Sequence, residues 1–166
     1  MREPGVLRAI ALLPLLAATA CAHSGAGVAD AASVAIERAI VRDSAAIGGE
    51  TAAYAVFVNS GAATAIVAAE CTCADSLEYH LVRREGPNPG MVKAWPLALP
   101  ANSRTEIAPP GVPRHLMLVG IREPVEVSET LTLRFPLADG SWIEGSFLAV
   151  PSSTEAWWAF DEADGG

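Results

Sequence analysis

The histidines and methionines of this sequence, whose side chains suit a soft metal ion, are concentrated in two short stretches, YHLVRREGPNPGM (79–91) and RHLM (114–117). The chain has only three histidines and three methionines, and all except the initiator Met1 and His23 lie there. The remaining four follow the spacing H-x10-M-x23-H-x-M and are His80, Met91, His115 and Met117. This concentration predicts that they act together.

Two imidazoles and two thioethers favour Cu(I). Thioethers select soft metals, and imidazole suits copper, zinc and nickel. All four donors are neutral, which suits a monovalent cation, and thioethers are not consumed by disulfide formation in an oxidising compartment. A single methionine is more often a core filler, so the joint pattern carries the hypothesis.

Cys71 and Cys73 form a C-x-C pair whose role has several interpretations. Two cysteines on one face of a strand could bind Cu(I) as thiolates, form a redox pair, or have a plain structural role. A disulfide between residues two apart is uncommon because its geometry is restrictive. The sequence leaves an auxiliary metal or redox role open beside the structural one.

The N-terminus predicts export. Two arginines flank the start of an apolar run, AIALLPLLAATA (9–20), that is too short to span a bilayer, and such a segment is typical of a signal peptide. The sequence AATAC resembles a lipoprotein processing site, so we expect lipidation of Cys21 after removal of residues 1–20. Ordinary cleavage after Ala20 or Ala22 is the competing interpretation.

The rest of the chain predicts one exported domain. A flexible tether (21–32) precedes a β domain (33–150), and an acidic tail with two adjacent tryptophans follows (151–166). We expect a location in the periplasm or on the outer face of the membrane, with the Cys21 lipid as the only membrane attachment. The formal net charge of −8 argues against nucleic-acid binding.

Short strands separated by turn residues predict an all-β sandwich or barrel. An Asp-Gly pair in ADGS (138–141) suits a tight hairpin between the last two strands. We predict strands over residues 33–43, 51–59, 64–70, 77–85, 91–99, 104–108, 114–121, 129–137 and 141–150.

Within the strand predicted over 114–121, His115 and Met117 leave the same face, about 7 Å apart along the chain. Leu116 and Leu118 then point into the core. His80 lies in a second predicted strand and Met91 opens a third. If these strands are neighbours, all four donors converge.

The same stretches resemble the periplasmic copper chaperone family PCu(A)C, whose members carry H(M)-x10-M-x21-H-x-M. The H-L-M-L-x-G stretch (115–120), the following G-x-x-x-P (120–124) and a Y-x4-N-x-G stretch (54–61) carry the resemblance, which covers about residues 33–150. It implies a cupredoxin-like Greek-key β-sandwich that delivers Cu(I), notably towards cytochrome c oxidase. By position, the copper ligands are His80, Met91, His115 and Met117.

The chain departs from the family pattern in two places. Leu81 and Val82 stand where members often have a methionine after the first histidine, and the second interval is two residues longer. Aligning Pro96 with a family proline puts Val92 in the place of Met91, so the register there has two alternatives.

The leading hypothesis is a Cu(I) carrier, not an enzyme, that passes copper to an oxidase subunit or another copper chaperone. One alternative is an electron-transfer protein, which would need a cysteine thiolate on the copper. Another is a β-sandwich lipoprotein with a structural or binding role. The sequence has no G-x-S-x-G motif, which would have suggested a hydrolase. It also has no carboxylate or third histidine placed beside the histidine pair as a zinc enzyme would need.

Overall fold

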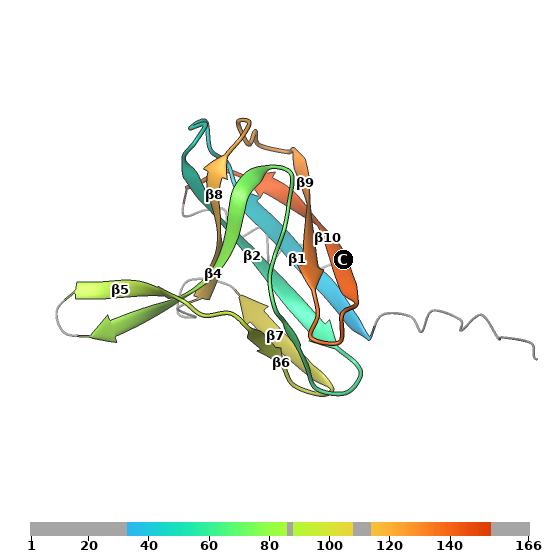
Figure 1. Cartoon of the computed structure of the whole chain (residues 1–166). Helices are drawn as coiled ribbons and strands as arrows, with labels where there is room; N and C mark the ends of the chain where they lie inside the picture. Colours follow the sequence, from blue (N-terminus) through green and yellow to red (C-terminus); the bar gives the residue numbers. More distant parts are fainter. Residues whose placement is uncertain (1–32, 86–87, 108–113, 154–166) are drawn as a thin grey trace, which may run out of the picture.

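The computed structural model describes residues 33–85, 88–107 and 114–153, and the regular elements of this part are all β-strands (Figure 1). No helix in these residues is long and apolar enough to cross a membrane. The predicted signal peptide, the tether, Cys21 and the tryptophan pair lie outside the described residues. The strands are β1 (Val34–Arg42), β2 (Glu50–Asn59), β3 (Thr64–Ile66), β4 (Ala74–Glu85), β5 (Asn88–Lys93), β6 (Leu97–Leu99), β7 (Ser103–Ile107), β8 (Arg114–Ile121), β9 (Thr130–Pro136) and β10 (Trp142–Val150).

Most strands belong to one sheet in the order β5-β4-β8-β2-β1-β10-β9, and β3 pairs with β6 in a second, small sheet. Strand β2 is central: β1 lies along one side, while β8 and β7 share the other. The first half of β2 pairs with β8 and the second half with β7. Strand β8 is therefore held between β2 and β4, and only β5 lies beyond β4.

The large sheet curls so that its two ends enclose a core. Phe57 on β2 packs edge-on against Phe135 on β9, with ring centroids 5.3 Å apart, although two strands separate them in the sheet. Phe135 in turn contacts Phe147 on β10 at 5.9 Å. All three rings are fully buried. Isolated bridges join Ile66 to Leu137 and Glu70 to Arg134, so the segment that begins with β3 lies against β9. The fold is a single β-sandwich-like domain, as expected from the sequence.

Alternating burial confirms the pattern predicted for two strands. In β8, Leu116 and Leu118 are fully buried, while His115 and Met117 are only partly buried. In β9, Leu133 and Phe135 are buried on the same face. The predicted Asp-Gly hairpin is also present. Gly140 adopts a φ of 86° there, a conformation that glycine accepts without a steric penalty.

The strand predicted over residues 91–99 is wrong, because the structure divides it into β5 and β6. The interruption contains Pro96, which has no N–H to donate to a ladder. The two halves then have different partners, since β5 pairs with β4 and β6 with β3. The end of β4 and the whole of β5 form a hairpin arm that projects from the body of the domain in Figure 1.

Gly120, near the end of β8, has a φ of 70°, and a Cβ atom there would overlap the Asp75 carboxylate. We expect Gly120→Ala to lower the free energy of unfolding by about 1–3 kcal/mol, because a non-glycine residue is strained in this region of backbone space. Urea denaturation measures the change. Gly90→Ala is the control, since its Cβ would meet nothing within 4 Å, and it should change stability by less than about 0.5 kcal/mol. Equal effects would contradict the steric argument.

Candidate metal centre

Two of the predicted ligands lie side by side because β4 and β8 pair antiparallel with His80 directly opposite His115. Residues directly opposite each other project from the same face of a sheet, with their Cβ atoms about 4.5–5.5 Å apart. The two imidazole rings are edge to face, with centroids 5.4 Å apart and an interplanar angle of 87°. The structure thus brings together histidines that are 35 residues apart in the chain.

Met117 shares this face. It lies two residues beyond His115 on β8, and it is paired with Glu78 on β4 and with Ala52 on β2. Because side chains alternate along a strand, the thioether and the imidazole of β8 leave the sheet on the same side. Met117 is only partly buried, so it is not a core filler.

Met91 lies on the same face but in the hairpin arm. It pairs with Val82 on β4, two residues beyond His80, whereas Val92 pairs with Leu81 and therefore projects from the opposite face. Met91 is 58% exposed. Of the two alternatives for this position, the register of β5 favours Met91. Its role as a ligand stays a prediction, because Met91 lies opposite Val82 and not opposite His80.

Glu78 also belongs to this face, and the sequence reasoning missed it. Its carboxylate lies 2.8 Å from Nε2 of His80, and its other oxygen accepts a hydrogen bond from Nζ of Lys93, the residue opposite His80 on β5. The hydrogen bond from Lys93, together with that from His80, lowers the pKa of Glu78 from its ordinary value, so the carboxylate is charged at neutral pH. The sequence did contain a signal for Glu78: it lies two residues before His80 in a predicted strand, and such residues share one face.

Two ring nitrogens at this site are buried and have no hydrogen-bond partner in the described structure: Nδ1 of His80 and Nε2 of His115. Burial of His115, and to a lesser extent the neighbouring His80, lower the pKa of the His115 imidazole. A buried polar atom without a partner costs stability, and native proteins rarely leave one. A neutral imidazole nitrogen without a proton is also the form that binds a metal ion.

The donors that the structure brings together fit a soft, monovalent ion. Two imidazole nitrogens and the Met117 thioether are neutral, and the carboxylate beside the histidine pair, that of Glu78, is already bonded to Lys93 and His80. No cluster of three or more His, Cys, Asp or Glu side chains suited to a metal occurs in the described residues. The Met117 thioether beside the two imidazoles favours Cu(I) over harder ions.

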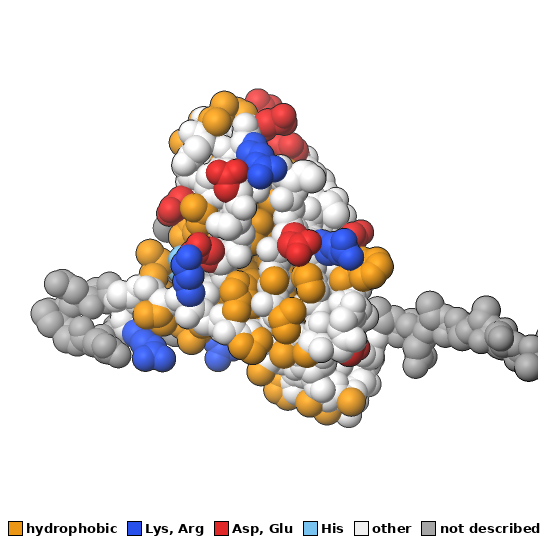
Figure 2. Space-filling view, viewed as in Figure 1, with side chains coloured by type: hydrophobic (Ala, Val, Ile, Leu, Met, Phe, Trp, Pro, Cys, Tyr) orange, Lys and Arg blue, Asp and Glu red, His pale blue; other side chains and the backbone are white. Residues whose placement is uncertain are grey.

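A hollow of about 380 Å³ opens beside Met117. Its lining includes Arg42, Asp43, Glu50 and Thr51 from the edges of β1 and β2. The thioether is thus reachable from solvent on the side away from the histidine pair. On the face drawn in Figure 2, acidic and basic side chains are interspersed and form no basic patch.

The structure does not bring the two cysteines to this face. Cys71 and Cys73 are joined by a disulfide just before β4. His80 lies seven positions after Cys73, which is about 23 Å along an extended strand. As a disulfide, neither sulfur is a thiolate that could bind copper. Their auxiliary metal or redox role is not tested by this arrangement.

Comparisons with known proteins define the fold class. The copper-bound PCuAC domain from PmoF2 matches with a TM-score of 0.58 and 18% identity, covering 72% of this chain and 93% of that one. Apo-DR1885 from Deinococcus radiodurans matches with a TM-score of 0.55 and 25% identity, covering 89% and 97%. Its copper(I) form, CuI-DR1885, has a TM-score of 0.54 and 22% identity over 74% and 83%. The resemblance to PCu(A)C domains is confirmed by these matches.

The family follows from the sequence match. Residues 34–148 match the family described as "Putative lipoprotein LpqE-like", and the chain belongs to it. The "Putative lipoprotein Lxx21020" of Leifsonia xyli subsp. xyli is 35% identical over 109 residues. That match covers 64% of this chain and 63% of the relative's length.

We expect Glu78 to fix the tautomer of His80. The carboxylate accepts from Nε2–H, so Nδ1 should carry the lone pair at pH 7.5. Long-range ¹⁵N–¹H correlation spectra of the metal-free protein should show this form, and Glu78→Ala should mix the two tautomers. Lys93→Ala is the control, because it removes the ion pair and leaves the bond to His80 intact. Unchanged His80 nitrogen shifts in Glu78→Ala would show that the carboxylate does not orient the ring.

Proposed function

We propose that this protein is an extracytoplasmic Cu(I) carrier that binds copper on the outer face of β4 and β8 and passes it to an accepting protein. One observation carries the proposal: two buried imidazole nitrogens without partners lie beside a solvent-accessible thioether on one face of the sheet. The similarity in fold to PCuAC-type domains, two of them copper-bound, supports it.

The site is suited to carrying rather than holding copper. His80, His115 and Met117 lie on neighbouring strands, whose ladders fix their spacing. Met91 lies on an exposed arm and can add a fourth donor without being required for the other three. Neutral donors stabilise Cu(I) without a charge that must be neutralised on release. A thioether that faces solvent gives an acceptor a donor atom to displace first.

The electron-transfer alternative is less well supported. A blue-copper centre needs a cysteine thiolate beside two imidazoles. The described cysteines are oxidised and lie about 23 Å along β4 from His80. A colourless Cu(I) complex fits the carrier, whereas an intense visible absorption of the Cu(II) form would support electron transfer.

The acceptor that the proposal implies is an exported copper protein, such as an oxidase subunit undergoing assembly or another copper chaperone. Such an acceptor must offer a copper site of equal or greater affinity within reach of the membrane surface. The lipoprotein description of the family supports attachment by a lipid at Cys21, which keeps the carrier at that surface.

The ligand set predicts a hierarchy of affinities in anaerobic Cu(I) titration against a competing chelator. His115→Ala and Met117→Ala should each weaken binding at least tenfold, about 1.4 kcal/mol or more. Met91→Ala should cost less, because its strand lies in the projecting arm. Val119→Ala is the matched control: it lies two residues beyond Met117 on the same face and has no donor atom.

Folding should be retained in all four variants, because none of these side chains is in the buried core. Circular dichroism and thermal denaturation check this. Copper binding that is as tight in His115→Ala and Met117→Ala as in Val119→Ala would overturn the proposed function.

Lipidation has its own test. Mass spectrometry of the membrane fraction should find a mature N-terminus at Cys21 that carries acyl chains, and Cys21→Ser should release the protein from the membrane. As a control, the Cys21→Ser variant is checked for export and for the position of its N-terminus. A soluble wild-type species that begins at His23 would contradict the lipid anchor without affecting the copper site.

A further inference from the structure

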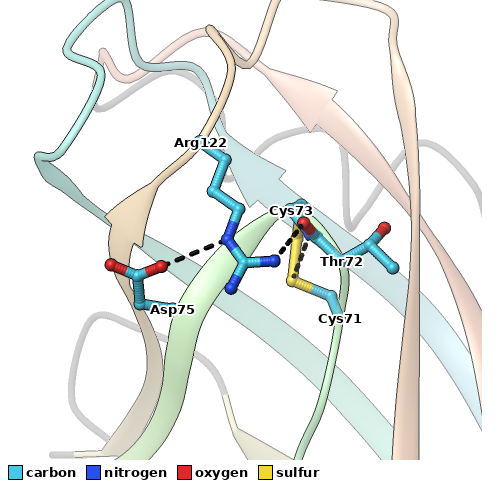
Figure 3. The surroundings of a disulfide bond; sticks show 5 residues. All are labelled: Cys71, Thr72, Cys73, Asp75 and Arg122. Atoms are coloured by element: carbon cyan, nitrogen blue, oxygen red, sulfur yellow. Dashed lines mark hydrogen bonds and ion pairs between the residues drawn. A yellow bond between two sulfur atoms is a disulfide. The ribbon is translucent and has the colours of Figure 1, made fainter.

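The Cys71–Cys73 disulfide has surroundings of its own (Figure 3). It lies apart from the face of β4 and β8 that carries the proposed ligands His80, His115 and Met117, which we call the copper face. It joins residues only two apart in the sequence, so the loop that it closes is among the shortest a disulfide can close. A disulfide stabilises a fold mainly by restricting the unfolded chain, and this gain is smallest for short loops. Structural stabilisation therefore accounts poorly for this bond.

Three groups around the bond suit chemistry at sulfur. The backbone N–H of Cys73 donates to Sγ of Cys71 at 3.2 Å. The guanidinium of Arg122 donates to the carbonyl of Thr72, between the two cysteines, at 3.3 Å. The Asp75 carboxylate holds the same guanidinium at 3.1 Å. The N–H donor on Sγ of Cys71 stabilises a thiolate there, and the guanidinium on the Thr72 carbonyl adds a cation beside the cysteine segment.

The bond is also accessible. Both cysteines are only partly buried, and the side chains of Arg122 and Asp75 are 55% and 71% exposed. Although both cysteine side chains also contact the core, we expect an incoming thiol to reach the sulfurs without unfolding the sandwich. Figure 3 shows the guanidinium directed toward the cysteine segment from the chain that follows β8.

We propose that Cys71–Cys73 is a thiol–disulfide exchange site that takes two electrons from a dithiol, with Cys71 as the leaving thiolate. The inference does not depend on the proposed copper function. Cys71 is the sulfur that leaves because it already accepts the Cys73 N–H, which stabilises the negative charge that develops on it.

The exchange has two balanced steps. A thiolate of the dithiol attacks Sγ of Cys73, a mixed disulfide forms there, and the Cys71–Cys73 bond breaks to release the Cys71 thiolate. The second thiolate of the dithiol then attacks the first sulfur of the same dithiol, which is bonded to Sγ of Cys73. That bond breaks, and the Cys73 thiolate is released. The dithiol loses two electrons and becomes a disulfide, the cysteine pair gains them, and the two protons of the dithiol go to the new thiolates or to solvent.

Dithiothreitol is the probe. It is used on the mature chain with Cys21→Ser, so that Cys71 and Cys73 are the only cysteines. We expect reduction of the folded protein, and Arg122→Gln should slow it about threefold, since a less stabilised thiolate leaves more slowly. Arg122→Lys should keep most of the rate. Arg104→Gln is the matched control, because it removes a guanidinium from another exposed ion pair, with Glu37.

A monothiol tests which sulfur leaves. Limiting glutathione followed by rapid alkylation should place glutathione on Cys73 and the alkyl group on Cys71, as read by peptide mass spectrometry. Reduction that requires denaturant, equal rates in Arg122→Gln and Arg104→Gln, or glutathione on Cys71 would each overturn the proposal. Cu(I) affinity should be unchanged in the double variant Cys71→Ser, Cys73→Ser, which separates this site from the copper face.

Discussion

The antiparallel register between β4 and β8 is the constraint on which the candidate site depends. It places His80 opposite His115 and, two residues away, Glu78 opposite Met117. A shift of one residue would turn every side chain of one strand to the other face. Tyr79, 4% exposed, and the fully buried Leu116 oppose that shift, because it would move them out of the core. Burying each such side chain contributes about 1.5–3 kcal/mol, so the core sets the geometry of a polar site that it does not contain.

Electrostatics refines what the register begins. A free carboxylate beside two imidazoles would make the face attractive to hard divalent cations. Glu78 is instead held by Lys93 and by His80, so its charge is balanced and its oxygens are occupied. The imidazole of His80 is orientated at the same time, in the way that outer-sphere carboxylates orientate ligating histidines. The result is that the carboxylate beside the histidine pair is occupied, which leaves the two imidazoles and the Met117 thioether as the neutral donors there.

The sequence was sufficient for the elements whose pattern is local. Alternation in RHLMLVG placed Leu116 and Leu118 inside and His115 and Met117 outside, and the Asp-Gly pair located the last hairpin. Pairing between distant strands was not readable, since a single sequence gives no register. For that reason His80 and His115 could be proposed as neighbours only through the family resemblance.

Other features escaped for identifiable reasons. The division between β5 and β6 turns on one proline within an otherwise strand-like run. Glu78 looked like any charged residue on a solvated face until its partners on β5 were known. The cysteine pair was interpreted with a disulfide as the uncommon outcome, and the structure has that disulfide. Of these features, the role of Glu78 depends on a contact between separate strands.

Strand β4 begins beside the cysteine pair and carries His80 near its middle, and the chemistry of the two places explains why they are separate. In an oxidising compartment, two neighbouring thiols form a disulfide and cannot hold Cu(I). Thioethers and imidazoles keep their donor atoms under the same conditions. A thiol pair within reach of the copper face would compete for the metal whenever it was reduced, and bound Cu(I) would then block thiol exchange. About 23 Å of extended strand would remove that competition, so the proposed copper site and the proposed exchange at the disulfide would not disable each other on one β-sandwich.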